Sequence, residues 1–220
     1  MSELFVDSIL KTYGTKQVLT DIHLTCKKGE IVGLLGRNGS GKSTLLKIIF
    51  GGVGAEGKYI RVGEKIINNL SENRKLINYL PQDNFLPSHI KIDRIINLFC
   101  NQTEGDIIRN IDWVKPYLHK KSSRLSGGER RMLEVYLIIY SDAKFVLIDE
   151  PFNGIAPLYK EELKTRIKEQ TQNKGFIITD HDYRNVINLA SRIVLIFDGG
   201  TKNIDNNEEL IEWGYLNSID

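Results

Sequence analysis

The chain has 220 residues, of which 41% are hydrophobic and 26% are charged, the ordinary balance of a folded globular domain. Its formal net charge of +2 gives no bulk electrostatic reason to expect nucleic acid or a membrane surface as a direct partner. No apolar run is long enough to cross a bilayer, the first residues lack the pattern of a signal peptide, and the two cysteines, Cys26 and Cys100, suit a reducing compartment. We therefore expect a cytoplasmic protein that reaches a membrane only through partners.

Apolar runs typical of strands alternate with segments of helical spacing along most of the chain. Up to about residue 30 the pattern predicts short strands joined by turns. Further strands are predicted at residues 31–35, 58–62, 77–80, 145–148, 176–179 and 193–196. Helices are predicted at about residues 45–50 and from Pro157 onward, and residues from about 83 to 140 lose the strand pattern and look helical. Continuous apolar strands that alternate with helices predict an α/β fold with a mostly parallel sheet, interrupted by a helical insertion.

The segment Gly36–Thr44 reads G-x-x-x-x-G-K-[ST], the pattern of a phosphate-binding loop. It lies between the apolar strand at 31–35 and a helix, where backbone N–H groups and the positive end of the helix point at a phosphate. Lys42 would place a cation against the β- and γ-phosphates, and the hydroxyl of Ser43 suits Mg²⁺. The predicted nucleotide contacts in this segment are Gly36, Asn38, Gly39, Ser40, Gly41, Lys42, Ser43 and Thr44.

Two carboxylates, Asp149 and Glu150, directly follow the apolar strand at 145–148. Ligands of parallel sheets bind beyond the carboxyl ends of the strands. Asp149 is therefore placed to hold Mg²⁺, directly or through water, and Glu150 to polarise an attacking water as a general base.

The run Leu125-Ser126-Gly127-Gly128-Glu129 permits two interpretations. Ser126 with Glu129 three residues later fits the capping box of an ordinary helix start. Gly127 and Gly128 instead suit a helix N-terminus whose exposed N–H donors approach an anion closely. The residues alone do not choose between the two.

Three further polar or aromatic residues, Tyr13, Gln82 and His181, lie next to predicted turns or strand ends. Each taken by itself is more often an ordinary loop residue than a functional one. The two arginines Arg130 and Arg131 are expected on a solvated helix face, with a contact to a phosphate or a partner as the alternative.

Taken in order, these motifs resemble those of the ATP-binding cassette (ABC) family of ATPases, and the resemblance covers nearly the whole chain. It implies that Tyr13 stacks on adenine, that Gln82 senses Mg²⁺ and the attacking water, and that His181 contacts the γ-phosphate. It implies that Ser126, Gly127 and Gly128 contact ATP held by another subunit. The catalytic set is then Lys42, Gln82, Glu150 and His181, the metal set is Ser43, Gln82 and Asp149, and ATP and Mg²⁺ are the expected cofactors.

The resemblance also implies a division of the single domain, residues 1–220, into three parts. These are a phosphate-loop NTPase core at about 31–57, 71–82 and 141–220, an antiparallel β subdomain at about 1–30 and 58–70, and an inserted α-helical subdomain at about 83–140. We expect a homodimer or heterodimer of cassettes with two composite sites, bound to integral-membrane transporter subunits near residues 83–86 on the inner face of the membrane, with no nucleic acid. Closing and opening of the dimer would drive transport.

Short segments of the sequence resemble two different branches of the family. Leu125–Arg131, Asp149–Phe152 and Thr179–Asp182 look like cassettes of lipopolysaccharide-export systems, whereas Gly154–Pro157 looks more like those of branched-chain amino-acid importers. Ala156 stands where many cassettes have an aspartate that faces the partner. The alternative to a transporter is a soluble ABC ATPase that acts as a mechanical clamp in translation or DNA repair; a phosphate-loop kinase would not explain Leu125–Glu129.

Overall fold

The computed structural model describes residues 2–73 and 75–216. Within them, ten strands form one mixed sheet in the order β5-β4-β1-β2-β10-β9-β3-β8-β7-β6. The strands are β1 (Glu3–Tyr13), β2 (Lys16–Lys27), β3 (Ile31–Leu35), β4 (Gly57–Val62), β5 (Lys65–Ile66), β6 (Ile77–Leu80), β7 (Phe145–Asp149), β8 (Gly175–Thr179), β9 (Arg192–Phe197) and β10 (Gly200–Ile204). The helices are α1 (Lys42–Phe50), α2 (Ile92–Phe99), α3 (Gln102–Arg109), α4 (Gly127–Ile139), α5 (Pro157–Gln170), α6 (Tyr183–Ile187) and α7 (Asn207–Glu212).

Strands β6, β7, β8, β3 and β9 run parallel, and helices cover both faces of this half of the sheet. Phe145 and Leu147 of β7 pack into the hydrophobic cluster that contains α1, whereas Val146 and Ile148 pack into the cluster that contains α4 and α5. Alternate residues of a strand point to opposite faces, so burial on both sides requires a continuous apolar run. The predicted α/β fold with a mostly parallel sheet is confirmed.

The first part of the chain differs from the expected series of short strands. It forms one long hairpin, β1 and β2, which turns at Gly14 with a positive φ of 59° and pairs on its outer side with β4. Ser8 also has a positive φ, 54°, where the register shifts between Val6 and Ile9. This bulge interrupts the alternation of buried residues, which makes one strand look like several pieces in the sequence.

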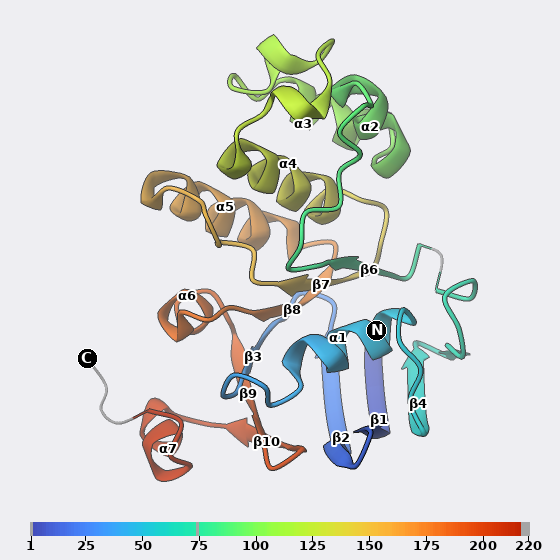
Figure 1. Ribbon diagram of the computed structural model, residues 1–220, viewed down its shortest axis with the longest axis vertical. Coiled ribbons are helices and arrows are strands. Elements are labelled where there is room, and N and C mark those ends of the chain that lie inside the picture. The colour runs from blue at the N-terminus through green and yellow to red at the C-terminus, as the bar shows by residue number, and fades with distance from the viewer. Residues whose placement is uncertain (1, 74, 217–220) are drawn as a thin grey trace.

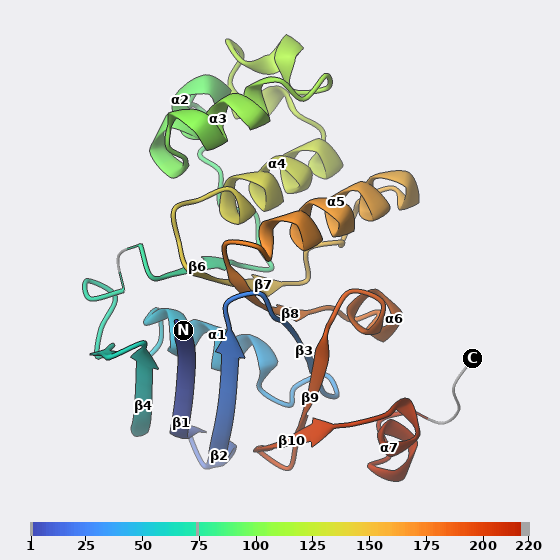
Figure 2. The ribbon, with the colours of Figure 1, turned by 180° about the vertical axis from the view of Figure 1, so that it is seen from behind.

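Strand β10 joins the two halves of the sheet, since it is antiparallel to β9 and pairs with β2 at Gly200 and Asp21. Neither β10 nor the short helices α6 and α7 are predicted from the sequence, because their apolar residues are too few to set a period. Figures 1 and 2 show α2, α3 and α4 together at one end of the molecule, on the side of β6 and β7 opposite α1, while β10 and α7 lie at the other end.

Aromatic residues pack the helical end of the molecule, formed by α2, α3 and α4, against α5. Tyr136 of α4 is fully buried, and its ring stacks on that of Tyr140 with centroids 6.1 Å apart. The ring centroid of Trp113 lies 6.3 Å from that of Tyr136. The Tyr136 hydroxyl donates to Oε1 of Glu162 on α5 at 2.6 Å. A large aromatic side chain at this position of α4 thus packs the helix against both the helical end and the core.

Candidate active site

Most of the predicted site residues come together at the carboxyl ends of β3, β6, β7 and β8. Parallel strands end at the same edge of the sheet, which brings residues far apart in the sequence into one cleft. The cleft has a volume of about 490 Å³. It is lined by Tyr13, Val18, Asn38, Gly39, Gly41, Lys42, Ser43, Thr44, Gln82, Glu150 and His181.

The loop between β3 and α1 forms a cradle of backbone that only glycine permits. Gly39 and Gly41 have φ values of 78° and 102°, and a Cβ on Gly41 would lie 2.7 Å from Cδ2 of Leu19. A Cβ on Gly36 would lie 2.5 Å from Oγ of Ser40, and that Oγ is buried without a hydrogen-bond partner among the described residues. A backbone cradle with an unpaired hydroxyl inside it fits the oxygens of a phosphate.

Lys42 is the first residue of α1, and its side chain folds back over the loop. Its Nζ donates to the carbonyl oxygens of Gly36 at 2.6 Å and Arg37 at 3.2 Å. Burial lowers the pKa of Lys42, and the negative charges of Asp149 and Glu150 act in the opposite direction. The ammonium group therefore lies inside the curve of the loop and in the field of both carboxylates.

Asp149 ends β7 with its side chain buried beneath the loop. The Tyr79 hydroxyl donates to its Oδ2 at 3.0 Å. Burial raises the pKa of Asp149, while hydrogen bonds from the hydroxyls of Ser43 and Tyr79 lower it. The neighbouring oxygens of Ser43 and Asp149 are the hard ligands that Mg²⁺ prefers, so both residues fit the ion.

Glu150 and Gln82 face each other across the ends of β7 and β6, where Nε2 of Gln82 donates to Oε2 of Glu150 at 3.0 Å. Glu150 has a φ of 51°, a left-handed conformation that a residue with a long side chain rarely adopts. Its backbone N–H donates to the carbonyl of Thr179 on β8 at 2.9 Å. The unusual turn at Glu150 directs its carboxylate into the cleft beside Gln82.

The edge of the cleft carries His181 and Tyr13. The His181 side chain is 57% exposed, and its Nδ1 lies 3.5 Å from Oδ1 of the buried Asp180. Oδ2 of Asp180 is buried without a partner among the described residues. Tyr13 is 49% exposed at the end of β1. Both rings are placed to contact a ligand that fills the cleft.

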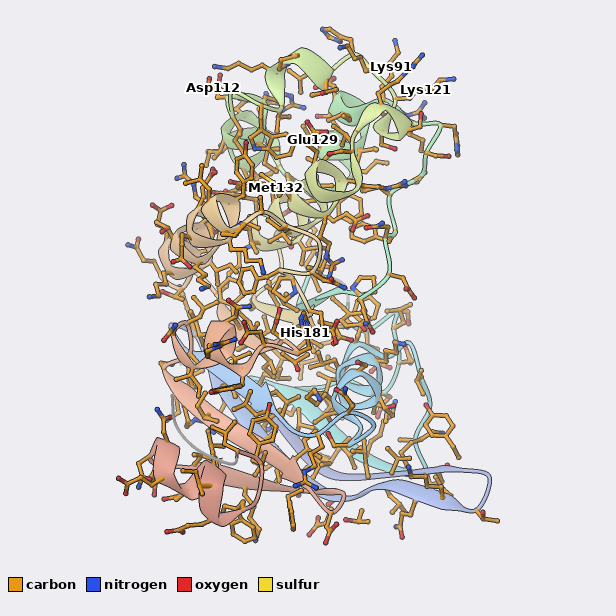
Figure 3. All side chains as sticks on the ribbon, turned by 60° about the vertical axis from the view of Figure 1, so that its left-hand side comes forward. Lys91, Asp112, Lys121, Glu129, Met132 and His181 are labelled. Atoms are coloured by element: carbon orange, nitrogen blue, oxygen red, sulfur yellow. The ribbon has the colours of Figure 1, made fainter. Side chains whose placement is uncertain are left out.

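Ser126, Gly127 and Gly128 do not belong to this lining. Ser126 caps α4: its Oγ accepts from the N–H of Glu129 at 3.3 Å, and its own N–H donates to Oε2 of Glu129 at 2.8 Å. A Cβ on Gly127 would meet none of the described residues within 4 Å, whereas one on Gly128 would lie 3.1 Å from the carbonyl oxygen of Gly154, so this helix start is open at Gly127 and covered at Gly128. Figure 3 shows Glu129 on the helical end of the molecule, apart from His181, which lies next to the sheet. The capping box is therefore present, and contact with an anion stays a prediction.

Arg131 contradicts the expectation of a solvated helix face, because it is only 4% exposed. It donates to backbone carbonyls at the ends of both β6 and β7, including those of Asp149 and Glu150. One signal was present in the sequence: Arg131 and Glu134 are charged residues three apart within an apolar helix. Such a pair is buried only when it is satisfied internally.

Comparisons with known proteins identify the family of the chain. A family model described as ABC transporter matches residues 19–153. The chain belongs to the ABC transporter ATP-binding family. The lipopolysaccharide export system ATP-binding protein LptB of Haemophilus influenzae is 31% identical, over 98% of this chain and 98% of that protein. The protein of the same name from Escherichia coli K12 is 30% identical, over 90% of this chain and 88% of its own length.

Solved structures share the fold of this ABC protein. A structure described as an ATP-binding subunit of an ABC transporter superposes with a TM-score of 0.82 at 21% identity, covering 96% of this chain and 93% of that one. A nucleotide-free ATP-binding cassette superposes with a TM-score of 0.80 at 20% identity. The family match and the relatives at 30–31% identity identify this ABC protein as an ATP-binding subunit of an ABC transporter, and the solved structures show the same fold. None of its helices within residues 2–73 and 75–216 is long and apolar enough to cross a lipid bilayer.

Proposed function

We propose that this ABC protein hydrolyses ATP with the help of Mg²⁺ and that hydrolysis takes place in the cleft at the carboxyl ends of β3, β6, β7 and β8. The observation that supports the proposal most directly is the hydrogen-bonded pair of Gln82 and Glu150, which faces the glycine cradle across the cleft. A carboxylate next to an amide can accept a proton from a water that the amide helps to hold.

The residues divide the work by position. The N–H groups of the loop and Lys42 bind the phosphates, and Tyr13 supports the adenine at the edge of the cleft. Ser43 and Asp149 would hold the metal, with Gln82 nearby. Bound Mg²⁺ neutralises charge on the phosphate oxygens. Glu150 accepts the proton of the attacking water, and His181 contacts the terminal phosphate from the exposed side.

We infer that a second cassette completes the site. Ser126, which caps α4, and Gly127 are exposed, and neither they nor Gly128 line the cleft of their own chain. A head-to-tail dimer would bring this helix start to the nucleotide of the partner cassette and so use the N–H donors. The dimer would drive transport by closing on ATP and opening after hydrolysis, held at the inner face of the membrane by integral-membrane subunits.

The test uses the purified full chain and measures phosphate release with ATP, with and without Mg²⁺. We expect Mg²⁺-dependent turnover and, for Glu150→Gln, a fall of about a hundredfold or more together with an ATP-dependent dimer in size-exclusion chromatography. Glu161→Gln, an exposed carboxylate of α5, is the control and should behave as wild type. Full turnover in Glu150→Gln would remove Glu150 from the role of base.

A further inference from the structure

The guanidinium group of Arg131 on α4 hydrogen-bonds to the backbone at the ends of both β6 and β7. Its Nη1 donates to the carbonyl of Pro81 at 2.8 Å, directly before Gln82. Its Nη2 donates to the carbonyls of Asp149 at 2.8 Å and Glu150 at 3.0 Å. The side chain is 5% exposed, so these charge-assisted bonds are formed away from water.

Glu134 holds this guanidinium in place. Its side chain is fully buried, and Oε2 lies 3.3 Å from Nη1 of Arg131. Oε1 accepts from the backbone N–H groups of Phe85 at 3.0 Å and Leu86 at 3.2 Å. A buried carboxylate with three such bonds restricts both its own position and that of the arginine. The pair also links α4 to the segment that follows Gln82.

The backbone at Glu150 needs such support. Its positive φ of 51° is costly for a glutamate, and a residue in this region stays there only when its surroundings hold it. The N–H of Glu150 is held by Thr179 and its carbonyl by Arg131. Without Arg131 one of the two backbone anchors on this residue is lost.

We propose that Arg131, oriented by Glu134, is a positioning residue that sets the Glu150 carboxylate against Gln82. The inference rests on the proposed hydrolysis and on the role of Glu150 as the base. Arg131 touches neither the cleft nor the carboxylate, and it acts on the peptide backbone of both strand ends.

The first test compares Arg131→Lys and Arg131→Gln with wild type. We expect kcat to fall roughly 10- to 100-fold in Arg131→Gln, because small displacements of a catalytic group have effects of this size. The affinity for a fluorescent ATP analogue should stay within about twofold, since the loop is untouched. Lysine keeps the charge beside Glu134 but lacks the fork, so Arg131→Lys should retain an intermediate kcat. Arg109→Gln is the matched control, an arginine that bonds to three side chains of the helical end.

A double-mutant cycle separates positioning from a general loss of structure. If Arg131 acts through Glu150, then adding Arg131→Lys to Glu150→Gln should lower the residual single-turnover rate no further. Equal losses in both backgrounds, or a matching loss of nucleotide affinity, would overturn the proposal. A wild-type kcat in both Arg131→Lys and Arg131→Gln would also overturn it. In that case, Mg²⁺-dependent turnover by the wild-type protein would still support the proposed function. Absence of that turnover in wild type would instead refute the proposed function itself.

Discussion

Ser126 offers a prediction that separates its two possible roles. Ser126→Ala removes the oxygen that accepts from the N–H of Glu129 and disrupts one half of the capping box. Loss of a serine cap costs about 1 kcal/mol of stability, within a range of roughly 0.5–2 kcal/mol. The 3.3 Å donor–acceptor distance is long, which places the expected loss in the lower half of that range. For a domain of this size the melting temperature should fall by about 2–4 °C for each kcal/mol.

Ser126→Asn supplies the matched comparison, because asparagine caps helices as well as serine does. Thermal unfolding without nucleotide should therefore give a wild-type melting temperature for Ser126→Asn and a lower one for Ser126→Ala. If the hydroxyl also contacts ATP across the dimer, both variants should lose turnover and ATP-dependent dimerisation. Dimerisation and turnover of Ser126→Asn at wild-type levels would refute the contact with ATP. An unchanged melting temperature in Ser126→Ala would refute the contribution of the cap.

Three further predictions follow from the described contacts. Lys42→Ala should weaken ATP binding measured by calorimetry, because it removes the cation inside the loop, and an unchanged affinity would count against the phosphate-loop assignment. The pKa of Glu129 lies below its ordinary value because the side chain and then the backbone of Ser126 hydrogen-bond to its carboxylate. The stabilisation by the ionised Glu129 should therefore be complete above the unfolded pKa of about 4.3 and be lost as pH falls through the lower folded pKa. The free energies of unfolding of wild type and Glu129→Gln, measured by denaturant melts, should then converge in acid. A difference in stability that stays constant with pH would contradict this. Cys26 and Cys100 are buried, and burial raises the pKa of both thiols, that of Cys100 to about 12. Iodoacetamide should therefore label neither cysteine in the native chain and both after denaturation. Rapid labelling of the native chain would show that the thiols are accessible.

The sequence by itself determined the local chemistry of this protein. The phosphate loop needs glycines, a lysine and a hydroxyl within nine consecutive residues, so Gly36–Thr44 is recognisable without any long-range contact. The apolar run before Asp149 likewise identifies a strand buried on both faces, because such a strand cannot alternate. Order and spacing of these local motifs were sufficient to predict the α/β fold and the family.

Only the tertiary structure decided which residues meet. Gln82 bonds to Glu150 across 68 positions, and Arg131 reaches the carbonyl of Pro81 across 50. The spacing of Arg131 and Glu134 within an apolar helix is a local signal of a buried pair, but it does not say which backbone carbonyls the arginine meets, since these are set by the packing of α4 near the ends of β6 and β7. The bulged β1 strand and the joining strand β10 depend in the same way on partners distant in sequence. Chemistry carried by consecutive residues is written in their order, whereas burial, pairing and backbone anchoring depend on what the rest of the chain brings alongside.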